Sequence, residues 1–341
     1  MTDPLAAKSA VRSTDAHAAA GEVKDAYARL RDEVHKVIVG QDDVLDQLLV
    51  ALFCGGHAIV VGVPGLAKTL LISTVARTLS LGFSRVQFTP DLMPSDMTGT
   101  EIIEEDKTTG ARELRFVKGP IFSNVILADE INRTPPKTQA ALLEAMQEKQ
   151  VTVAGVQHKL PRPFFVLATQ NPIEQEGTYP LPEAQVDRFM LKVVVSYPNK
   201  DEERKVVDLA LGETAREVKP VLEPDQILHM QSLVKRVYLD DKVRDYVLEL
   251  VTATRHPEAY QLKDLKNLIE FGASPRASIY LCHAARAGAF LAGRGFVTPQ
   301  DVKDIAYDVL RHRVILSYEA EAEEISSEQV VKRILESVPV P

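Results

Sequence analysis

The chain has 341 residues and a formal net charge of −8, from 48 acidic and 40 basic side chains. This length favours two domains over one core, and an acidic chain without any dense block of Lys and Arg gives no support for nucleic-acid binding. The only two cysteines lie far apart, and no apolar run is long enough to span a membrane. These features predict a cytoplasmic protein without a disulfide framework or a membrane span.

The first 20 residues are rich in Ala, Ser, Thr and Asp and contain few large apolar side chains, which predicts a flexible N-terminal tail. A helix is expected over about 21–36, and a second helix begins near Asp42 with leucines and valines at helical spacing. These apolar residues precede the first expected strand, so they are candidates for the wall of an adenine pocket.

The stretch at 62–69, Gly-Val-Pro-Gly-Leu-Ala-Lys-Thr, is the most informative local motif. It follows a short apolar run, Ala58 to Val61, which predicts a buried strand, and it leads into a helix opened by Thr69. A glycine-rich turn between a strand and a helix aims backbone N–H groups and the positive end of the helix dipole at one point. The pattern therefore predicts a phosphate-binding loop, in which Lys68 reaches the β- and γ-phosphates and Thr69 ligates Mg²⁺.

One residue departs from the usual form of this motif, which has Gly where this chain has Ala67. We expect Ala67 to lie at the helix entrance with a negative φ, where Ala is tolerated. A positive φ would cost roughly 1–2 kcal/mol and would weaken the interpretation. The plain alternative is a Gly/Pro turn with no ligand.

Two adjacent carboxylates, Asp129 and Glu130, end an apolar strand expected over 124–128. Such a pair at the end of a buried strand needs a cation or hydrogen bonds. Mg²⁺ bound with a triphosphate meets this need, so Asp129 is expected to hold the metal and Glu130 to act as general base on the attacking water. The alternative is a solvated pair of acids.

Further strands are expected near 85–88, 164–168 and 191–195, and alternating residues predict hairpins at about 100–119 and 150–161. Strands that alternate with helices indicate a three-layer α/β domain with a parallel sheet, whose ligand site lies at the carboxyl ends of the strands. Only helices are expected after residue 198. We therefore predict a nucleotide-binding domain over 21–198 and a helical lid domain over 199–341.

Arg276 is singled out by its place in the first turn of a helix that begins at Ser274-Pro275. A cation there opposes the helix dipole at a cost of roughly 0.3–1 kcal/mol, so an anion should compensate it. A bound triphosphate would do so.

These motifs, in this order, resemble those of the MoxR family of AAA+ ATPases over nearly the whole chain after the tail. The segments that carry the resemblance are Val39-Gly40-Gln41, the loop at 62–69, Ala128 to Arg133, Ala168 to Pro172 and Glu183 to Phe189. The family commonly carries Ala at the position of Ala67, and the two hairpins are similar to the insertions of its branch of AAA+ proteins. The resemblance implies a three-layer P-loop NTPase core with an all-helical lid.

The resemblance also implies roles for single residues. Asn171 is similar to the first sensor, with a turn-capping Asn as the alternative, and Arg188 to the arginine finger that serves a neighbouring subunit, with a solvated surface Arg as the alternative. Arg276 is similar to the second sensor, acting in cis or in trans, and Arg133 is a candidate interface cation. The expected ATP contacts are Val39, Gly40, Gly62, Pro64, Gly65, Leu66, Ala67, Lys68, Thr69, Leu70 and Asp129, and the expected metal ligands are Thr69 and Asp129.

By the same resemblance, the chain is expected to be a Mg²⁺-dependent ATP hydrolase that works as a ring, of six subunits, with a chaperone-like role in the maturation or metal insertion of partner proteins. A von Willebrand A domain protein is the implied partner. Two alternatives stay open: an ATP-binding assembly scaffold with little turnover, and a DNA-remodelling motor. The second is disfavoured because Glu101, Glu104, Glu105 and Asp106 outnumber Lys107 and Arg112 on the first hairpin.

Overall fold

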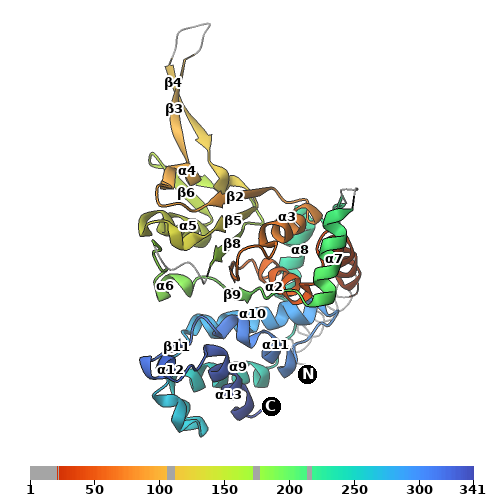
Figure 1. Ribbon diagram of the computed structural model, residues 1–341, viewed down its shortest axis with the longest axis vertical. Helices are drawn as coiled ribbons and strands as arrows, with labels where there is room; N and C mark the ends of the chain where they lie inside the picture. Colours follow the sequence, from red (N-terminus) through yellow and green to blue (C-terminus); the bar gives the residue numbers. More distant parts are fainter. Residues whose placement is uncertain (1–20, 22, 106–111, 172–176, 213–216) are drawn as a thin grey trace, which may run out of the picture.

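The structure is a computed structural model, and it describes residues 21, 23–105, 112–171, 177–212 and 217–341. The predicted N-terminal tail over 1–20 and the expected hairpin turn at 107–110 lie outside these residues. In Figure 1 a sheet-containing part lies above a group of helices, with a narrow hairpin projecting from the sheet-containing part at the end opposite these helices.

The central sheet has five parallel strands in the order β2-β5-β8-β1-β9. These strands are β1 (Ala58–Val61), β2 (Phe83–Gln87), β5 (Val125–Asp129), β8 (Phe165–Gln170) and β9 (Leu191–Val194). The three central strands are β5, β8 and β1, and all but the last residue of each is buried. Their continuous apolar runs explain this position, because strands covered on both faces need apolar side chains on both sides.

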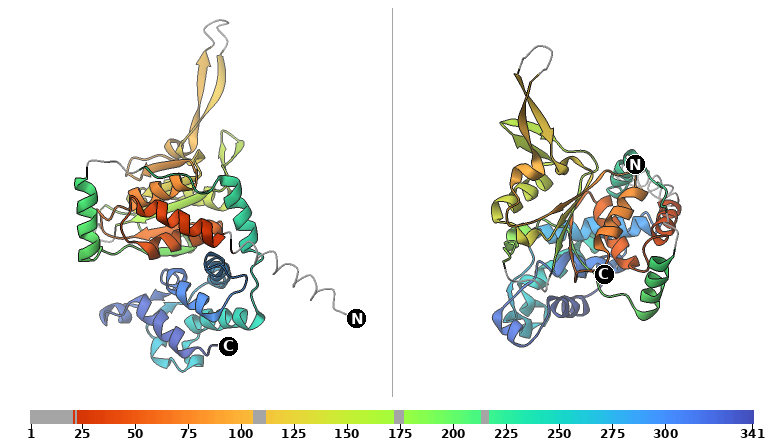
Figure 2. Two further views of the ribbon diagram at one scale, coloured as in Figure 1. Left: turned by 90° about the vertical axis from the view of Figure 1, so that its right-hand side faces the viewer. Right: turned by 45° about the horizontal axis from the view of Figure 1, so that its top comes forward.

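Helices cover both faces of this sheet. Alternate side chains of a strand point to opposite faces, and Ala58 and Val60 accordingly pack with a helix over 23–35, α2 (Asp42–Phe53) and α3 (Lys68–Thr78). Ile59 packs in a separate cluster with α4 (Pro94–Thr98) and α5 (Pro136–Glu148). The two clusters form the two cores of a three-layer α/β arrangement, which confirms the predicted fold class; Figure 2 shows these layers from two further directions.

Two antiparallel hairpins stand outside the central sheet. The long one pairs β3 (Gly99–Glu105) with β4 (Arg112–Lys118), and the short one pairs β6 (Gln150–Val153) with β7 (Val156–Lys159). Phe116 of the first hairpin stacks on His158 of the second, with ring centroids 4.0 Å apart. The bases of the two hairpins therefore support one another, while the far end of the long hairpin projects into solvent (Figure 1).

The region after β9 is helical, as predicted, with one addition. Its helices are α7 (Lys200–Leu211), α8 (Pro224–Val234), α9 (Asp241–Arg255), α10 (Pro275–Leu291), α11 (Pro299–Leu310), α12 (Tyr318–Ala322) and α13 (Ser327–Ser337). The addition is a short antiparallel pair, β10 (Ile269–Phe271) with β11 (Ile315–Leu316), which the sequence analysis did not predict. Two and three paired residues are too few for a recognisable alternation.

The remaining short elements are α6 (Glu183–Val186) and the 3₁₀ turns η1 (Pro120–Phe122), η2 (Ile131–Arg133), η3 (Pro257–Tyr260) and η4 (Lys263–Lys266). Helix α7 has no buried residue and lies beside the first part of the chain, and α8 packs against α2 and α10. Domain boundaries at residues 20 and 198 stay a prediction.

Candidate functional site

The loop at 62–69 lies at the carboxyl end of β1 and leads directly into α3. Gly65 has a φ of 87°, and no atom lies within 4 Å of the place where a Cβ would be, so the loop leaves open space at this turn. The Lys68 ammonium donates to the Gly62 carbonyl at 2.6 Å. Burial lowers the pKa of the Lys68 ammonium, and the nearby carboxylates of Asp129 and Glu130 oppose this shift. Lys68 and both acids therefore share one electrostatic environment.

Ala67 differs from the expectation. It is the N-cap of α3, with a φ of 55° and a ψ of 23°, and so occupies the left-handed region; the expected negative φ was wrong. The physical reason is that the loop must reverse direction before Lys68 begins the helix, and a left-handed residue makes this reversal. The cost of this backbone for Ala, roughly 1–2 kcal/mol, is therefore stored at the loop.

Replacing Ala67 with Gly should relieve this strain. We expect the thermal unfolding midpoint of the nucleotide-free protein to rise by about 2 °C, because Gly adopts positive φ without a steric penalty. Ala76 lies inside the same helix, and Ala76→Gly is the matched control, expected to lower the midpoint. Differential scanning calorimetry of the two variants checks both signs, and a lower midpoint for Ala67→Gly would contradict the strain.

Asp129 is the last residue of β5 and Glu130 follows it, and Thr169 of the adjacent strand β8 connects them. The Thr169 hydroxyl donates to Asp129 Oδ1 at 2.6 Å and accepts the backbone N–H of Glu130 at 2.8 Å. Arg85 donates to Asp129 Oδ2 at 2.6 and 3.0 Å. Glu130 has a φ of 57°, so its side chain leaves the strand direction. These contacts fix both carboxylates at one edge of the sheet.

The Glu130 carboxylate accepts two further hydrogen bonds. Gln87 Nε2 donates to Glu130 Oε2 at 2.7 Å, and Arg133 Nη1 donates to the same oxygen at 3.0 Å. Arg133, which the resemblance suggested as an interface cation, thus contacts the carboxylate of its own chain. Arg85, Gln87 and Thr169 were not predicted from the sequence as residues of this site. The pairing register of β2 with β5 could have indicated Gln87, because this residue ends β2 directly opposite Asp129.

Asn171 directly follows β8 and is 8% exposed. Because β8 lies between β5 and β1, the sheet places Asn171 at the same edge as Lys68, Asp129 and Glu130. The structure therefore brings these four predicted residues together.

A pocket lies beside the loop, but the apolar residues of α2 that were expected to wall an adenine pocket do not line it and are buried in the core instead. A pocket of about 500 Å³ is lined by Val37, Ile38, Val39, Gln41, Ala67, Leu70, Val206, Leu209 and Ala210, among others. Gly40 has a φ of 64°, and a Cβ there would lie 2.5 Å from the Glu202 carboxylate of α7. The amide of Gln41 donates to the Leu66 carbonyl at 3.2 Å, which ties the two segments together. The contribution of α7 was missed, since nothing in its sequence shows which surface it lies against.

The oxygen donors at this edge suit Mg²⁺. The predicted ligands, the Thr69 hydroxyl and the Asp129 carboxylate, are hard oxygen groups of the kind that Mg²⁺ prefers. Among the residues that the structure describes, no cluster of three or more His, Cys, Asp or Glu forms a complete protein cage for a metal.

Arg188 and Arg276 lie elsewhere. Both line a pocket of about 430 Å³, together with Gly56, His57 and Lys235. Gly56 and His57 precede β1, whereas the loop at 62–69 follows it, so the arginines and Lys68 lie at opposite ends of this strand. Figure 1 also shows that α6 and α3 lie over opposite faces of the sheet. The cation in the first turn of α10 is compensated by Asp187, whose Oδ2 lies 2.7 Å from Arg276 Nη1.

The strand order β2-β5-β8-β1-β9, with a glycine-rich loop after β1 and paired acids after β5, defines the P-loop ATPases of the AAA+ class. Residues 57–191 match the model of the ATPase family associated with various cellular activities (AAA), and residues 263–334 match the AAA lid domain.

No helix within the described ranges is both long and apolar enough to cross a membrane.

Individual relatives agree with this class. The chain is 47% identical to "Chaperone MoxR1" of Mycobacterium tuberculosis, over 91% of this chain and 81% of that protein. It is 32% identical to "Protein MoxR" of Methylorubrum extorquens, over 93% and 96% of the two chains. The crystal structure of a candidate ATPase from Cytophaga hutchinsonii superposes with a TM-score of 0.89 at 46% identity, covering 96% of this chain and 98% of that one. The chain belongs to the MoxR family of AAA+ ATPases.

Proposed function

We propose that the protein hydrolyses ATP, with Mg²⁺, in a ring in which each nucleotide is shared by two subunits. The observation that carries this proposal is the separation of two half-sites within one chain. Lys68, Asp129 and Glu130 lie at the carboxyl end of β1 and its neighbours, whereas Arg188 and Arg276 lie at the opposite end. A single chain therefore does not bring these groups to one triphosphate, but adjacent chains in a ring do.

The first half-site binds the nucleotide and directs the water. We assign the phosphates to the backbone of residues 62–69 and to Lys68, and the base to the pocket beside α7. Thr69 and Asp129 would hold the bound Mg²⁺ ion, and this ion would supply positive charge to the phosphates. Glu130 accepts a proton from the attacking water, and its bonds with Gln87 and Arg133 hold its carboxylate for this role. Asn171, directly after β8, orients the water.

The second half-site supplies cations to the neighbour. Arg188 and Arg276 line the same pocket and are linked through Asp187, so we propose that both act in trans. Arginines placed this way neutralise the charge that develops on the transferred phosphoryl group. The number of subunits, six, comes from the family resemblance.

The work performed with the ATP is proposed to be chaperone-like remodelling of partner proteins, in line with the relative named "Chaperone MoxR1". The long hairpin offers a protein-binding surface, because Ile103 and Leu114 pair across its strands and are each 69% exposed. A role in metal or cofactor insertion and a von Willebrand A domain partner belong to the same proposal, as does a cytoplasmic location.

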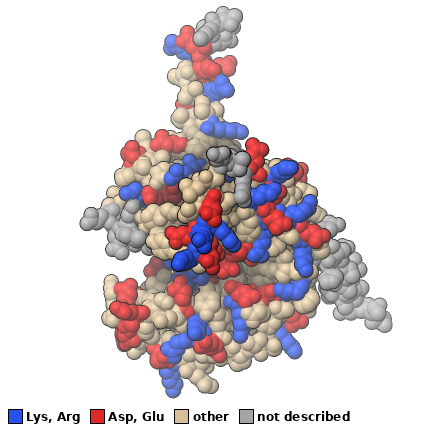
Figure 3. All heavy atoms as spheres, turned by 45° about the vertical axis from the view of Figure 1, so that its right-hand side comes forward, with Lys and Arg blue, Asp and Glu red and all other residues tan. Residues whose placement is uncertain are grey.

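The hairpin charges do not favour a DNA-remodelling motor. Glu104 pairs with Arg115 and Glu105 with Arg112, so these two arginines of the described part of the hairpin already contact carboxylates. Figure 3 shows acidic and basic side chains mixed along the hairpin. The other alternative, an assembly scaffold that binds ATP with little turnover, is separated by measuring steady-state phosphate release against ring formation.

Lys68→Ala should abolish function at its first step. We expect ATP affinity to fall about a hundredfold, because charge-assisted hydrogen bonds to the phosphates are lost. Isothermal titration with ATP and Mg²⁺ measures this change, and Lys242→Ala, an exposed lysine on α9, is the matched control with unchanged affinity. Retained ATP affinity in the Lys68 variant would overturn the proposed function.

A further inference from the structure

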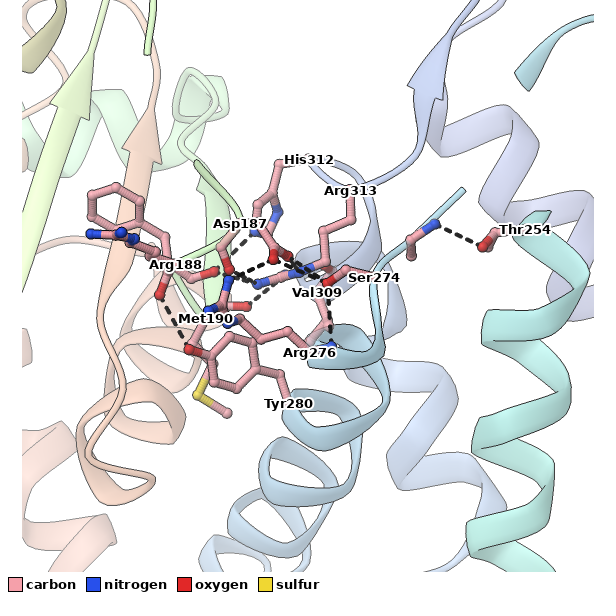
Figure 4. A network of polar contacts seen from close by, with 12 residues as sticks. Asp187, Arg188, Met190, Thr254, Ser274, Arg276, Tyr280, Val309, His312 and Arg313 are labelled. Carbon is pink, nitrogen blue, oxygen red and sulfur yellow. Dashed lines mark hydrogen bonds and ion pairs between the residues drawn. The ribbon is translucent and has the colours of Figure 1, made fainter. Parts of the chain in front are cut away.

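The segment Asp187 to Met190 joins α6 to β9 and carries Arg188; we call it the finger segment. Side chains from the C-terminal helical region hold the backbone carbonyl of every one of its residues (Figure 4). Arg313 donates to the carbonyls of Asp187 at 2.9 Å, Phe189 at 2.6 Å and Met190 at 3.2 Å. Tyr280 donates to the carbonyl of Arg188 at 3.2 Å, and His312 lies 3.1 Å from that of Phe189.

Arg313 is the centre of these contacts. Its side chain is 1% exposed, and Nε donates to Asp187 Oδ1 at 2.8 Å. Together with the carbonyls above and that of Val309, this uses all five N–H donors of the guanidinium. Burial lowers the pKa of Arg313 to about 10, while the Asp187 carboxylate raises it, so the group stays charged at neutral pH.

The Asp187 carboxylate extends the network to Arg276. Its Oδ1 accepts from Arg313, its Oδ2 accepts from Arg276 at 2.7 Å, and both oxygens lie within 3.1 Å of the Ser274 hydroxyl. Ser274 is the N-cap of α10, and Arg276 is in the first turn of that helix. One carboxylate therefore connects the residue preceding Arg188 with the start of the helix that carries Arg276.

We propose that Arg313, through Asp187, is the positioning residue that sets Arg188 and Arg276 in a fixed relation to each other and to the neighbouring subunit's nucleotide. A buried ion pair is weak evidence for stability, because well-packed apolar side chains often serve as well. The contribution that we assign to the Arg313–Asp187 pair is positional. The planar guanidinium of Arg313 has five N–H donors in fixed directions, and these determine where three backbone carbonyls of the finger segment lie. The inference rests on the proposed sharing of each site between subunits.

The test uses mixed rings. An Arg188→Ala subunit keeps its own nucleotide half-site, and a Glu130→Gln subunit supplies arginines but does not hydrolyse. We expect their mixture to regain ATP turnover. If this first mixture stays inactive, the shared site itself is wrong, which separates failure of the proposed function from failure of the inference.

The inference is tested by adding a second change to the Glu130→Gln donor. With Arg313→Lys or Asp187→Asn, we expect the kcat of the mixture to fall about tenfold, with KM for ATP unchanged because the acceptor's pocket is intact. Tyr280→Phe keeps the ring, whose centroid lies 5.0 Å from Arg313 Cζ, and removes only the bond to Arg188, so a fall of about threefold is expected.

Arg311→Lys in the same donor is the matched control. Arg311 lies two residues away and pairs with Asp308 at 2.8 Å instead of the finger segment, so full rescue is expected. Sedimentation gives the ring content of each mixture, and kcat is expressed per ring. If Arg313→Lys does not fold, Asp187→Asn and Tyr280→Phe decide the question. Full rescue per ring by these donors, or an equal loss with Arg311→Lys, would overturn the positioning role.

Discussion

Arg188→Ala is expected to lower the kcat for ATP hydrolysis by about a thousandfold, because an arginine supplied in trans contributes roughly 10³–10⁵ to phosphoryl transfer. The affinity of the same subunit for ATP should stay unchanged, since Arg188 lies at the end of β1 remote from Lys68. Phosphate release under saturating ATP measures the first quantity, and fluorescence titration with a labelled nucleotide measures the second.

Wild-type activity is expected to depend on protein concentration, because an arginine supplied by a neighbouring subunit is present only in assembled rings. Turnover per subunit should climb as rings assemble and then reach a plateau, whereas the Arg188→Ala variant should stay low at every concentration. Arg244→Ala removes an exposed arginine of α9 that pairs with Asp241, and it should behave as wild type. The shared active site would be contradicted if the Arg188→Ala variant kept full activity and the turnover of the wild type did not depend on protein concentration.

Glu130→Gln is expected to lower kcat by about 10²–10⁴, the usual contribution of a general base, while ATP binding is retained. The replacement preserves side-chain size, and its amide oxygen still accepts from Gln87, so the geometry of the site should persist. Only the ability to accept a proton is removed. Single-turnover hydrolysis of radiolabelled ATP, compared with equilibrium binding of the same nucleotide, separates the two properties.

Glu144→Gln, an exposed acid on α5, is the matched control for this variant and should leave kcat unchanged. Wild-type turnover by Glu130→Gln would place the base elsewhere. Because the variant should hold ATP for long periods, it also serves to capture partner proteins in their bound state, and its eluate identifies the client for which the long hairpin is proposed.

The core of the fold follows from the sequence because its signals are local. The apolar runs at Ala58 and Val125 are short and bounded by Gly or polar residues, and both became central strands within a residue of the predicted limits. Parallel strands bring their carboxyl ends to one edge, which explains why Gly65, Asp129 and Asn171 could be assigned to one edge of the sheet before any contact was known.

The features that were missed depend on contacts between distant segments. Arg85 lies 44 positions before Asp129 and is brought to it by strand pairing, and Arg276 finds its counter-charge in Asp187 rather than in the expected phosphate. The left-handed backbone of Ala67 was also missed. Alanine disfavours a positive φ, so an alanine in the sequence does not indicate that conformation. Arg313 belongs to no sequence motif, so its burial and its contacts became known only from the folded structure.

The opposite placement of the two half-sites along β1 restricts how copies of this chain associate. A two-fold symmetric dimer joins like surfaces, so it would set one nucleotide edge against another and leave both without arginines. The proposed sharing of each site between subunits would instead need head-to-tail contact, with every copy facing the same way round a closed ring. In such a ring, the nucleotide of each copy would contact only the neighbour that supplies its arginines, so hydrolysis in one copy would act directly on the copy at that side and not on the other.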